Sequence, residues 1–264
     1  MIFNKAIFHV IIVSNKPLSE EIYEKTFQPF GRGYTSCLYR GGLSLLAVSC
    51  SNASSGSGGG GGSVTYTVGD IVFKDGSIMA YADFAALSST EKGAKNDSAV
   101  AVIFDATNKL GVGLYPSLAG WCISTATAYN ANQYATSLTD GKANTDQIKG
   151  LSDYSETNYP AFHYAANYGA TRFAGTSYAS GWYLPAKDEL QKLCDAQSTV
   201  RSVFKGLSQY NNLPDTYYFS SSQITESGNE KNAWQLYFSD GNWQKTKKDI
   251  TEGYICLVCA IRKF

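Results

Sequence analysis

The chain has 264 residues, and 22 lysine and arginine residues balance 22 aspartate and glutamate residues to give a net charge of zero. A chain of this length can form one large domain or two small ones. Its balanced surface has no net field to attract phosphate groups or anionic lipid, so we do not expect nucleic acid as a partner. Charged residues make up only 17%. The abundance of Tyr and Gly is typical of adaptable binding surfaces and also of exported β-rich proteins.

Residues 1–63 divide into a predicted leader and a predicted tether. Arg40, the apolar residues 43–48 and several small residues precede Cys50, and "LAVSC" looks like the lipobox of a bacterial lipoprotein signal. We therefore expect residues 1–49 to be a leader, residues 1–33 being either an over-extended start of translation or a poor signal. The apolar run near the N-terminus is far shorter than the roughly 20 residues of a membrane-spanning helix.

Cys50 is the predicted lipidation site, and the Ser/Gly-rich residues 50–63 are the predicted tether between the anchor and a folded domain. This interpretation places the protein on the bacterial cell surface or outer membrane, held by lipid alone. The alternative is an ordinary linker that contains a cysteine by chance.

Residues 64–264 have the composition of a globular domain. Residues 63–77 predict a hairpin-like start that leads to Asp75-Gly76, and residues 98–106 predict a buried strand whose partner follows an Asn-Lys turn. Residues 121–180 show no clear period apart from a short helix at "YPAFHYAANYG". Because long irregular stretches often carry function, this region is of interest.

The stretch "GWYLPAKDELQKL" predicts a helix over residues 185–197. Leu184 and Pro185 form its entry, because proline presets φ and lacks an N–H that the first turn leaves unpaired. Asp188 and Glu189 fall in the first turn, where they complement the helix dipole. A second short helix is predicted to follow, with Ser198 as its cap.

The stretch "AWQLYFSDGNWQKTKK" predicts a hairpin with a two-residue Asp240-Gly241 turn. With that turn, Phe238 opposes Trp243 and strand alternation puts the two on one buried face. Trp234 and Leu236 share that inward face, whereas the other face is a polar and aromatic platform. The last strand, "YICLVCAIRKF", is apolar on both faces and is predicted to lie in the middle of a sheet.

Reactive side chains are few. Cys256 and Cys259 lie three apart on a predicted strand, so they point to opposite faces with Cα atoms roughly 10 Å apart, too far for a disulfide. The chain contains only two histidines, His9 and His163. These are too few ligands for a histidine-based metal site to be expected. We therefore expect no enzyme, metal or cofactor, and the alternative is an oxidase or hydrolase that uses Cys256 or His163.

The order of "WYLPAKDEL", "YYFSSSQ", "AWQLYFSDGNW" and a closing "CAIRKF" resembles the C-type lectin fold of the formylglycine-generating-enzyme type. The branch that it resembles most is that of bacterial surface proteins and treponemal variable lipoproteins diversified by retroelements. The start "VGDIVFKDGS" is also similar, so the match covers about residues 66–264. It implies an α+β class with a C-type-lectin-like fold: a mixed or antiparallel sheet, two or more short helices and long irregular segments.

The resemblance implies a ligand-binding display domain that recognises a protein or a glycan through the hairpin platform and the neighbouring loop. The implied ligand-binding residues are Gln223, Thr225, Glu226, Asn229, Asn232, Gln235, Tyr237, Ser239, Asn242, Gln244 and Thr246. Gln235, Gln244, Lys245 and Glu252 depart from the asparagine-derived variable positions of diversified relatives, which indicates an undiversified paralogue or a different template. A structural envelope component without a soluble ligand is a further alternative.

Overall fold

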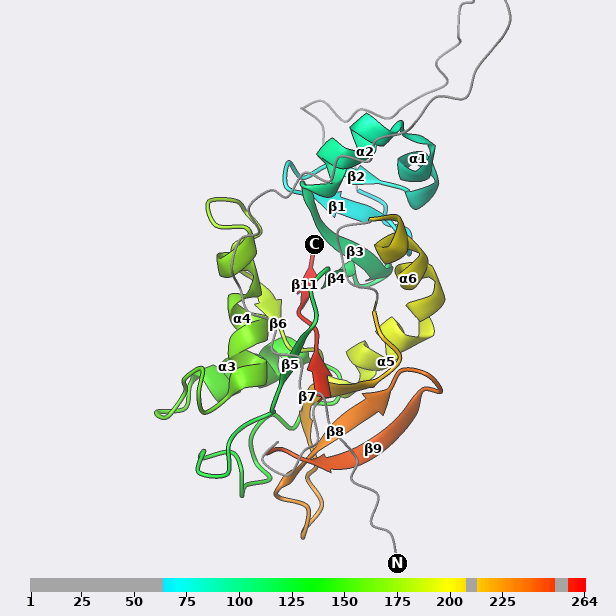
Figure 1. Ribbon diagram of the computed structural model, residues 1–264. Helices are drawn as coiled ribbons and strands as arrows, with labels where there is room; N and C mark the ends of the chain where they lie inside the picture. The colour runs from blue at the N-terminus through cyan, green and yellow to red at the C-terminus, as the bar shows by residue number, and fades with distance from the viewer. Residues whose placement is uncertain (1–63, 208–212, 250–255) are drawn as a thin grey trace, which may run out of the picture. The chain divides into compact units, whose positions relative to one another are not determined.

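The computed structural model describes residues 64–207, 213–249 and 256–264 (Figure 1). The predicted leader, the predicted tether and the predicted lipidation site Cys50 lie outside the described residues. Within the described ranges, no helix combines the length and the apolar character that crossing a bilayer requires.

Two sheets form the β part of the described chain. One has the strand order β2-β1-β3-β4-β11-β6 and the other the order β5-β10-β7-β8-β9. Neighbouring strands are antiparallel except β10 and β7, which are parallel. The strands are β1 (Ile71–Phe73), β2 (Ile78–Met79), β3 (Ala99–Asp105), β4 (Leu110–Gly113), β5 (Ser117–Ala119), β6 (Trp182–Tyr183), β7 (Tyr217–Gln223), β8 (Asn232–Tyr237), β9 (Asn242–Lys247), β10 (Cys256–Val258) and β11 (Ile261–Lys263).

Helices lie on both sides of these sheets. They are α1 (Tyr81–Ala86), α2 (Ser89–Asn96), α3 (Gly141–Lys149), α4 (Pro160–Arg172), α5 (Lys187–Asp195) and α6 (Gln197–Gly206). Helices α5 and α6 contact β3, and α5 also contacts β7 and β8, whereas α3 and α4 contact β5, β6 and β7. Figure 1 shows α3 and α4 (green) on one side of the strands and α5 and α6 (yellow) on the other. The predicted α+β class is confirmed at this level.

The strand β3 separates two hydrophobic cores. Val102 and Phe104 belong to a first core with residues of α5 and α6, and Ala101 and Ile103 belong to a second core with residues of α4. Every residue of β3 is buried, as its apolar sequence predicted. The hairpin-like start is also confirmed as β1 and β2, and Gly76 adopts a φ of +86° in their turn.

The predicted C-terminal strand is two strands, which corrects the sequence interpretation. Strand β10 lies between β5 and β7 in the five-stranded sheet, and β11 lies between β4 and β6 in the other. Cys259 and Ala260 connect them and are buried. Each strand is interior to its sheet, which accounts for the apolar side chains on both faces.

The predicted helix at residues 185–197 is present as α5, but it begins at Lys187 and ends at Asp195. Glu189 has a specific role there: its carboxylate accepts hydrogen bonds from Ala186 N (2.8 Å), Gly141 N (3.0 Å) and the Tyr183 hydroxyl (3.0 Å). Burial raises the pKa of Glu189. The carboxylate thus joins the starts of α5 and α3, beyond the dipole effect expected from sequence. The following helix α6 begins at Gln197, without the predicted Ser198 cap.

Helix α3 lies in the stretch that the sequence predicted to be mostly irregular. The Asp140 side chain caps it by accepting a hydrogen bond from Ala143 N at 2.8 Å. A Cβ atom on Gly141 would lie 2.4 Å from the Leu184 carbonyl oxygen, so only glycine permits this close approach. Helix α4, by contrast, was predicted, and it begins at Pro160.

Candidate ligand-binding surface

The predicted hairpin is formed by β8 and β9, at the edge of the five-stranded sheet. Its register pairs Tyr237 with Asn242, Leu236 with Trp243 and Gln235 with Gln244. The turn has four residues, 238–241, and it is closed by a hydrogen bond from Gly241 N to Tyr237 O of 2.9 Å. Gly241 has a φ of +71°, which favours glycine at this position.

The predicted two-residue turn, which would set Phe238 opposite Trp243, is therefore wrong. The observed pairing is displaced by two residues from the predicted one. Because side chains alternate with a period of two, this displacement changes the partners but keeps each strand residue on its predicted face.

One face of the hairpin, here named the tryptophan face, carries Trp234 and Trp243. Both indoles are half-buried, with ring centroids 6.4 Å apart and planes nearly perpendicular. The Lys187 ammonium lies 4.1 Å from the Trp234 ring centroid and 5.3 Å from that of Trp243. The Trp243 indole N–H donates to Gln191 Oε1 at 2.7 Å. Helix α5 therefore holds both rings in place.

The prediction that this face is wholly core is correct for two of its residues. Leu236 is fully buried, as is Phe238 in the turn, whose ring centroid lies 4.2 Å from that of Tyr218. Trp234 and Trp243 are instead partly accessible, because β9 is an edge strand and Lys187 and Gln191 of α5 reach only part of each ring. The sequence does not reveal this exposure, since α5 and β8 are separated by more than thirty residues.

The opposite face, named the glutamine face, is less open than predicted. Gln235 is 6% exposed, and its side chain accepts from the Cys256 thiol (3.0 Å) and donates to Gln244 Oε1 (3.3 Å). Thr246 is also buried. Trp121 and other residues of the 121–135 segment pack in the second core with Ala233 of β8 and cover part of this face.

The loop between β7 and β8 folds back toward the tryptophan face. Asn229 N donates to the Glu226 carbonyl at 3.1 Å, and the Asn232 amide donates to Asn229 Oδ1 at 3.2 Å. The Glu226 carboxylate pairs with the Lys245 ammonium of β9. This ion pair brings the loop beside the indoles and adds two opposite charges to the same surface.

The structure divides the predicted ligand-binding residues into two groups. Gln223, Gln235 and Thr246 are buried, so the prediction that they face a ligand is wrong. Gln223, at 0% exposure, is directed inward and accepts a hydrogen bond from Lys248 at 2.8 Å. The remaining residues are exposed or half-buried: Thr225, Glu226, Asn229, Asn232, Tyr237, Ser239, Asn242 and Gln244.

The cysteines of the described ranges are free thiols in buried positions: Cys122, Cys194, Cys256 and Cys259. As the sequence predicted, Cys256 and Cys259 face opposite cores. Burial raises the pKa of both thiols to about 12. They are therefore protonated at neutral pH, and a thiolate is the form that nucleophilic chemistry requires.

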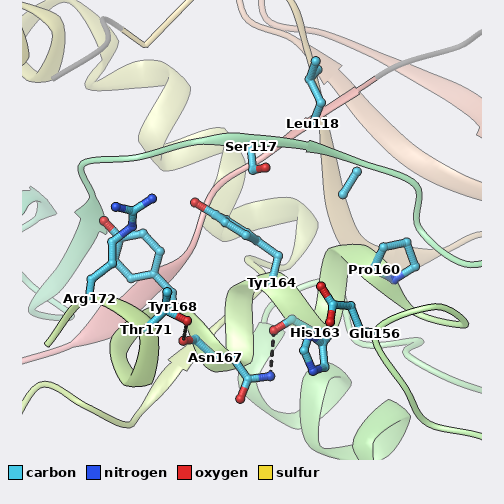
Figure 2. Close-up of a pocket in the computed structure, with 11 residues that line it drawn as sticks. Ser117, Leu118, Glu156, Pro160, His163, Tyr164, Asn167, Tyr168, Thr171 and Arg172 are labelled. Atoms are coloured by element: carbon cyan, nitrogen blue, oxygen red, sulfur yellow. Dashed lines mark hydrogen bonds between the residues drawn. The ribbon is translucent and has the colours of Figure 1, made fainter. Parts of the chain in front are cut away.

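His163 lines a pocket of about 420 Å³ between α4 and β5 (Figure 2). Figure 2 shows His163, Asn167 and Thr171 along one side of α4, with Ser117 and Leu118 of β5 across the pocket. The Asn167 amide and the Thr171 hydroxyl donate to carbonyls of their own helix. Among the described residues, no side chain forms a hydrogen bond with the His163 imidazole, so no nucleophile–base pair is assembled there.

In the described part of the chain, no three His, Cys, Asp or Glu side chains come together as a metal site. No protein-family model matches the chain, and no match was found among curated proteins. A fimbrial protein from Bacteroides ovatus ATCC 8483 has a similar fold, with a TM-score of 0.51 and 15% sequence identity. The similarity covers 75% of this chain and 49% of the fimbrial chain, so this chain spans about half the length of that protein.

Proposed function

We propose that the chain is a surface-displayed binding protein with a C-type-lectin-like domain, which uses the β8–β9 hairpin to bind a protein or glycan ligand. In this proposal Cys50 carries the lipid anchor on a bacterial outer membrane, and residues 50–63 form the tether. The observation that carries the binding role is the pair of half-buried indoles on the tryptophan face, held in fixed positions by α5.

Rigid aromatic side chains are effective anchors for recognition. An indole supplies a large apolar area and a single N–H, and tryptophan is enriched among residues that dominate binding energy. Here Lys187 and Gln191 fix the ring orientations, so little side-chain entropy remains to be lost when a ligand binds. Lys245 and Glu226 supply a charged rim beside the rings.

The fimbrial neighbour supports a surface role, because its name places that protein in an extracellular appendage. We assign binding rather than catalysis to this chain on the chemistry of its reactive groups. Cys256 is 2% exposed and its thiol donates to Gln235. His163 lies in a separate pocket beside α4.

Binding of the full chain to a glycan microarray and to immobilised surface-protein extracts tests this proposal. Once a ligand is found, Trp234→Ala and Trp243→Ala should each weaken binding at least tenfold, as loss of a binding anchor does. The matched control is Asn242→Ala together with Gln244→Ala on the glutamine face, which should retain binding. The opposite result would move the site to the glutamine face, and full binding by all variants would remove it from the hairpin.

A further inference from the structure

Lys248 follows β9 directly and is fully buried, at 0% exposure. Its ammonium nitrogen lies close to five oxygen atoms from two separate segments, residues 128–131 and residues 223–230. These are Ala128 O (2.6 Å), Gln223 Oε1 (2.8 Å), Glu230 O (2.8 Å), Ala131 O (3.1 Å) and Tyr129 O (3.4 Å). A buried ammonium is costly unless its donors are satisfied, and this oxygen cage satisfies them.

The oxygen cage is composed of neutral groups. Among the described residues, its acceptors are four backbone carbonyls and one side-chain amide, and none is a carboxylate. The centroid of the Trp121 ring lies 4.8 Å from the ammonium nitrogen, and the ring adds a cation–π contact. Burial lowers the pKa of Lys248 to about 8, so the charged form predominates at neutral pH.

The backbone of Lys248 connects the same segments. Trp121 N and Cys122 N donate to the Lys248 carbonyl at 3.0 and 3.2 Å, and Lys248 N donates to the Lys231 carbonyl at 2.9 Å. The residue therefore holds together the 121–131 segment, the 223–231 loop and the end of β9. This loop carries Glu226, which pairs with Lys245 beside the indoles.

We propose that Lys248 is a tethered internal cation that takes the place of a bound metal ion and holds the 223–231 loop in the conformation used for ligand binding. The consequence for binding rests on the proposed function, but the organisation of the two loops does not. Lys248 is a positioning residue in this proposal, since it does not reach the tryptophan face itself.

The number and kind of the oxygens distinguish this arrangement from an ordinary lysine hydrogen bond. An ammonium has three N–H donors, whereas five oxygens surround this one, as they would surround an ion. Calcium sites typically use charged carboxylates, but backbone carbonyls alone coordinate potassium ions in channel filters. If the lysine side chain is removed, the emptied cage should therefore accept a free monovalent cation such as ammonium or potassium.

The test compares the full chain with Lys248→Ala and Lys248→Met, and Lys149→Ala, an exposed lysine of α3, is the control. Amide hydrogen exchange reports order in residues 121–131 and 223–231, and it needs no ligand. We expect at least tenfold faster exchange in both segments of Lys248→Ala, with little change in β3 and β4. Lys149→Ala should behave as the unaltered chain.

Cation rescue separates the internal-cation role from simple packing. At constant ionic strength, ammonium or potassium chloride should slow the exchange of Lys248→Ala and raise its Tm, whereas tetramethylammonium chloride, which is too large for the cage, should not. Lys248→Met fills the cage with an uncharged chain, so it should exchange rapidly and not respond to ammonium. If Lys248→Ala is folded only when ammonium or potassium is present, that result also supports the proposal.

Three outcomes would overturn the proposal. The first is exchange at the normal rate in both loops of Lys248→Ala, and the second is normal exchange in Lys248→Met, which would assign the role to packing. The third is an equal response of Lys248→Ala to ammonium and to tetramethylammonium. If Lys248→Ala does not fold in any salt, the exchange rate of Lys248→Met decides. None of these measurements uses a ligand, so they test the role of Lys248 even if the proposed binding function is wrong.

Discussion

The strands β3 and β9 are both antiparallel to a neighbour, yet they occupy opposite positions in the molecule. All seven residues of β3 are buried, because β1 and β4 flank it and cores cover both of its faces. Strand β9 is an edge strand in which most side chains are exposed or half-buried. The difference indicates that β3 stabilises the fold, whereas β9 is the strand to which the proposed function assigns recognition.

The largest effect is expected in β3. Ile103 is fully buried in the second core, so Ile103→Ala should lower the free energy of unfolding by about 3 kcal/mol through lost burial and a residual cavity. Urea denaturation measures this loss. Ligand binding by the folded fraction should not change, and a binding loss without a stability loss would contradict the division between the two strands.

The next largest effect is expected on ligand affinity, when the hydrogen bond from α5 to the tryptophan face is removed. Gln191→Leu removes the oxygen that accepts from the Trp243 N–H but retains a side chain of similar size. We expect ligand affinity to fall about fivefold, corresponding to about 1 kcal/mol for a lost hydrogen bond. Calorimetric titration with the identified ligand measures the change. Unaltered affinity would mean that the indole needs no support from α5.

The pH dependence of stability should include a contribution from Asp105 at the end of β3. Burial raises the pKa of Asp105, but hydrogen bonds from Lys192 and Asn108 more than offset this effect, and the pKa lies below its ordinary value. A lowered carboxyl pKa contributes stability above the unfolded-state pKa near 4, and this contribution is lost as the pH falls through the folded-state pKa. Asp105→Asn should therefore cost about 1 kcal/mol or less at pH 7 and reduce the acid-side slope, as measured by urea denaturation between pH 2 and pH 7.

The smallest effect is expected on the exposed part of the glutamine face. Asn242 and Gln244 are exposed, so replacing both with alanine should change the free energy of unfolding by less than about 0.5 kcal/mol. Thermal denaturation measures this difference. A larger loss would show that the weak contact between Gln244 and Gln235 contributes to the fold.

The parts of the fold that the sequence predicted are those with local patterns. Strand β3 has an uninterrupted apolar run, and α4 begins with proline. Helix α3 was not predicted from the sequence, because its buried side is largely polar. Asn144 donates to Ser221 Oγ (3.0 Å), and Thr145 Oγ1 accepts from Leu184 N (3.2 Å). Such contacts join residues far apart in the chain, and hydrophobic periodicity does not detect them.

The candidate site was predictable only in part for the same reason. Alternation along β8 gave the correct face for each strand residue, since the pleat is a local property. The burial of Gln235 depends on the 121–135 segment, and the exposure of Trp234 depends on how far α5 reaches. No sequence pattern identifies Lys248 as a buried residue, because lysine is almost never fully buried unless its charge is paired. The oxygen partners of its ammonium lie between 18 and 120 residues away in the chain.

The buried thiols affect how long the protein remains functional in oxidising surroundings. Cys122, Cys194, Cys256 and Cys259 are shielded from oxidants while the domain is folded, but opening of the domain releases all four at once. In oxidising surroundings, a disulfide formed between released cysteines is one that the folded domain does not contain, so a crosslinked chain cannot regain its native packing. Each opening there exposes the protein to irreversible loss, so its working lifetime depends on how seldom it opens.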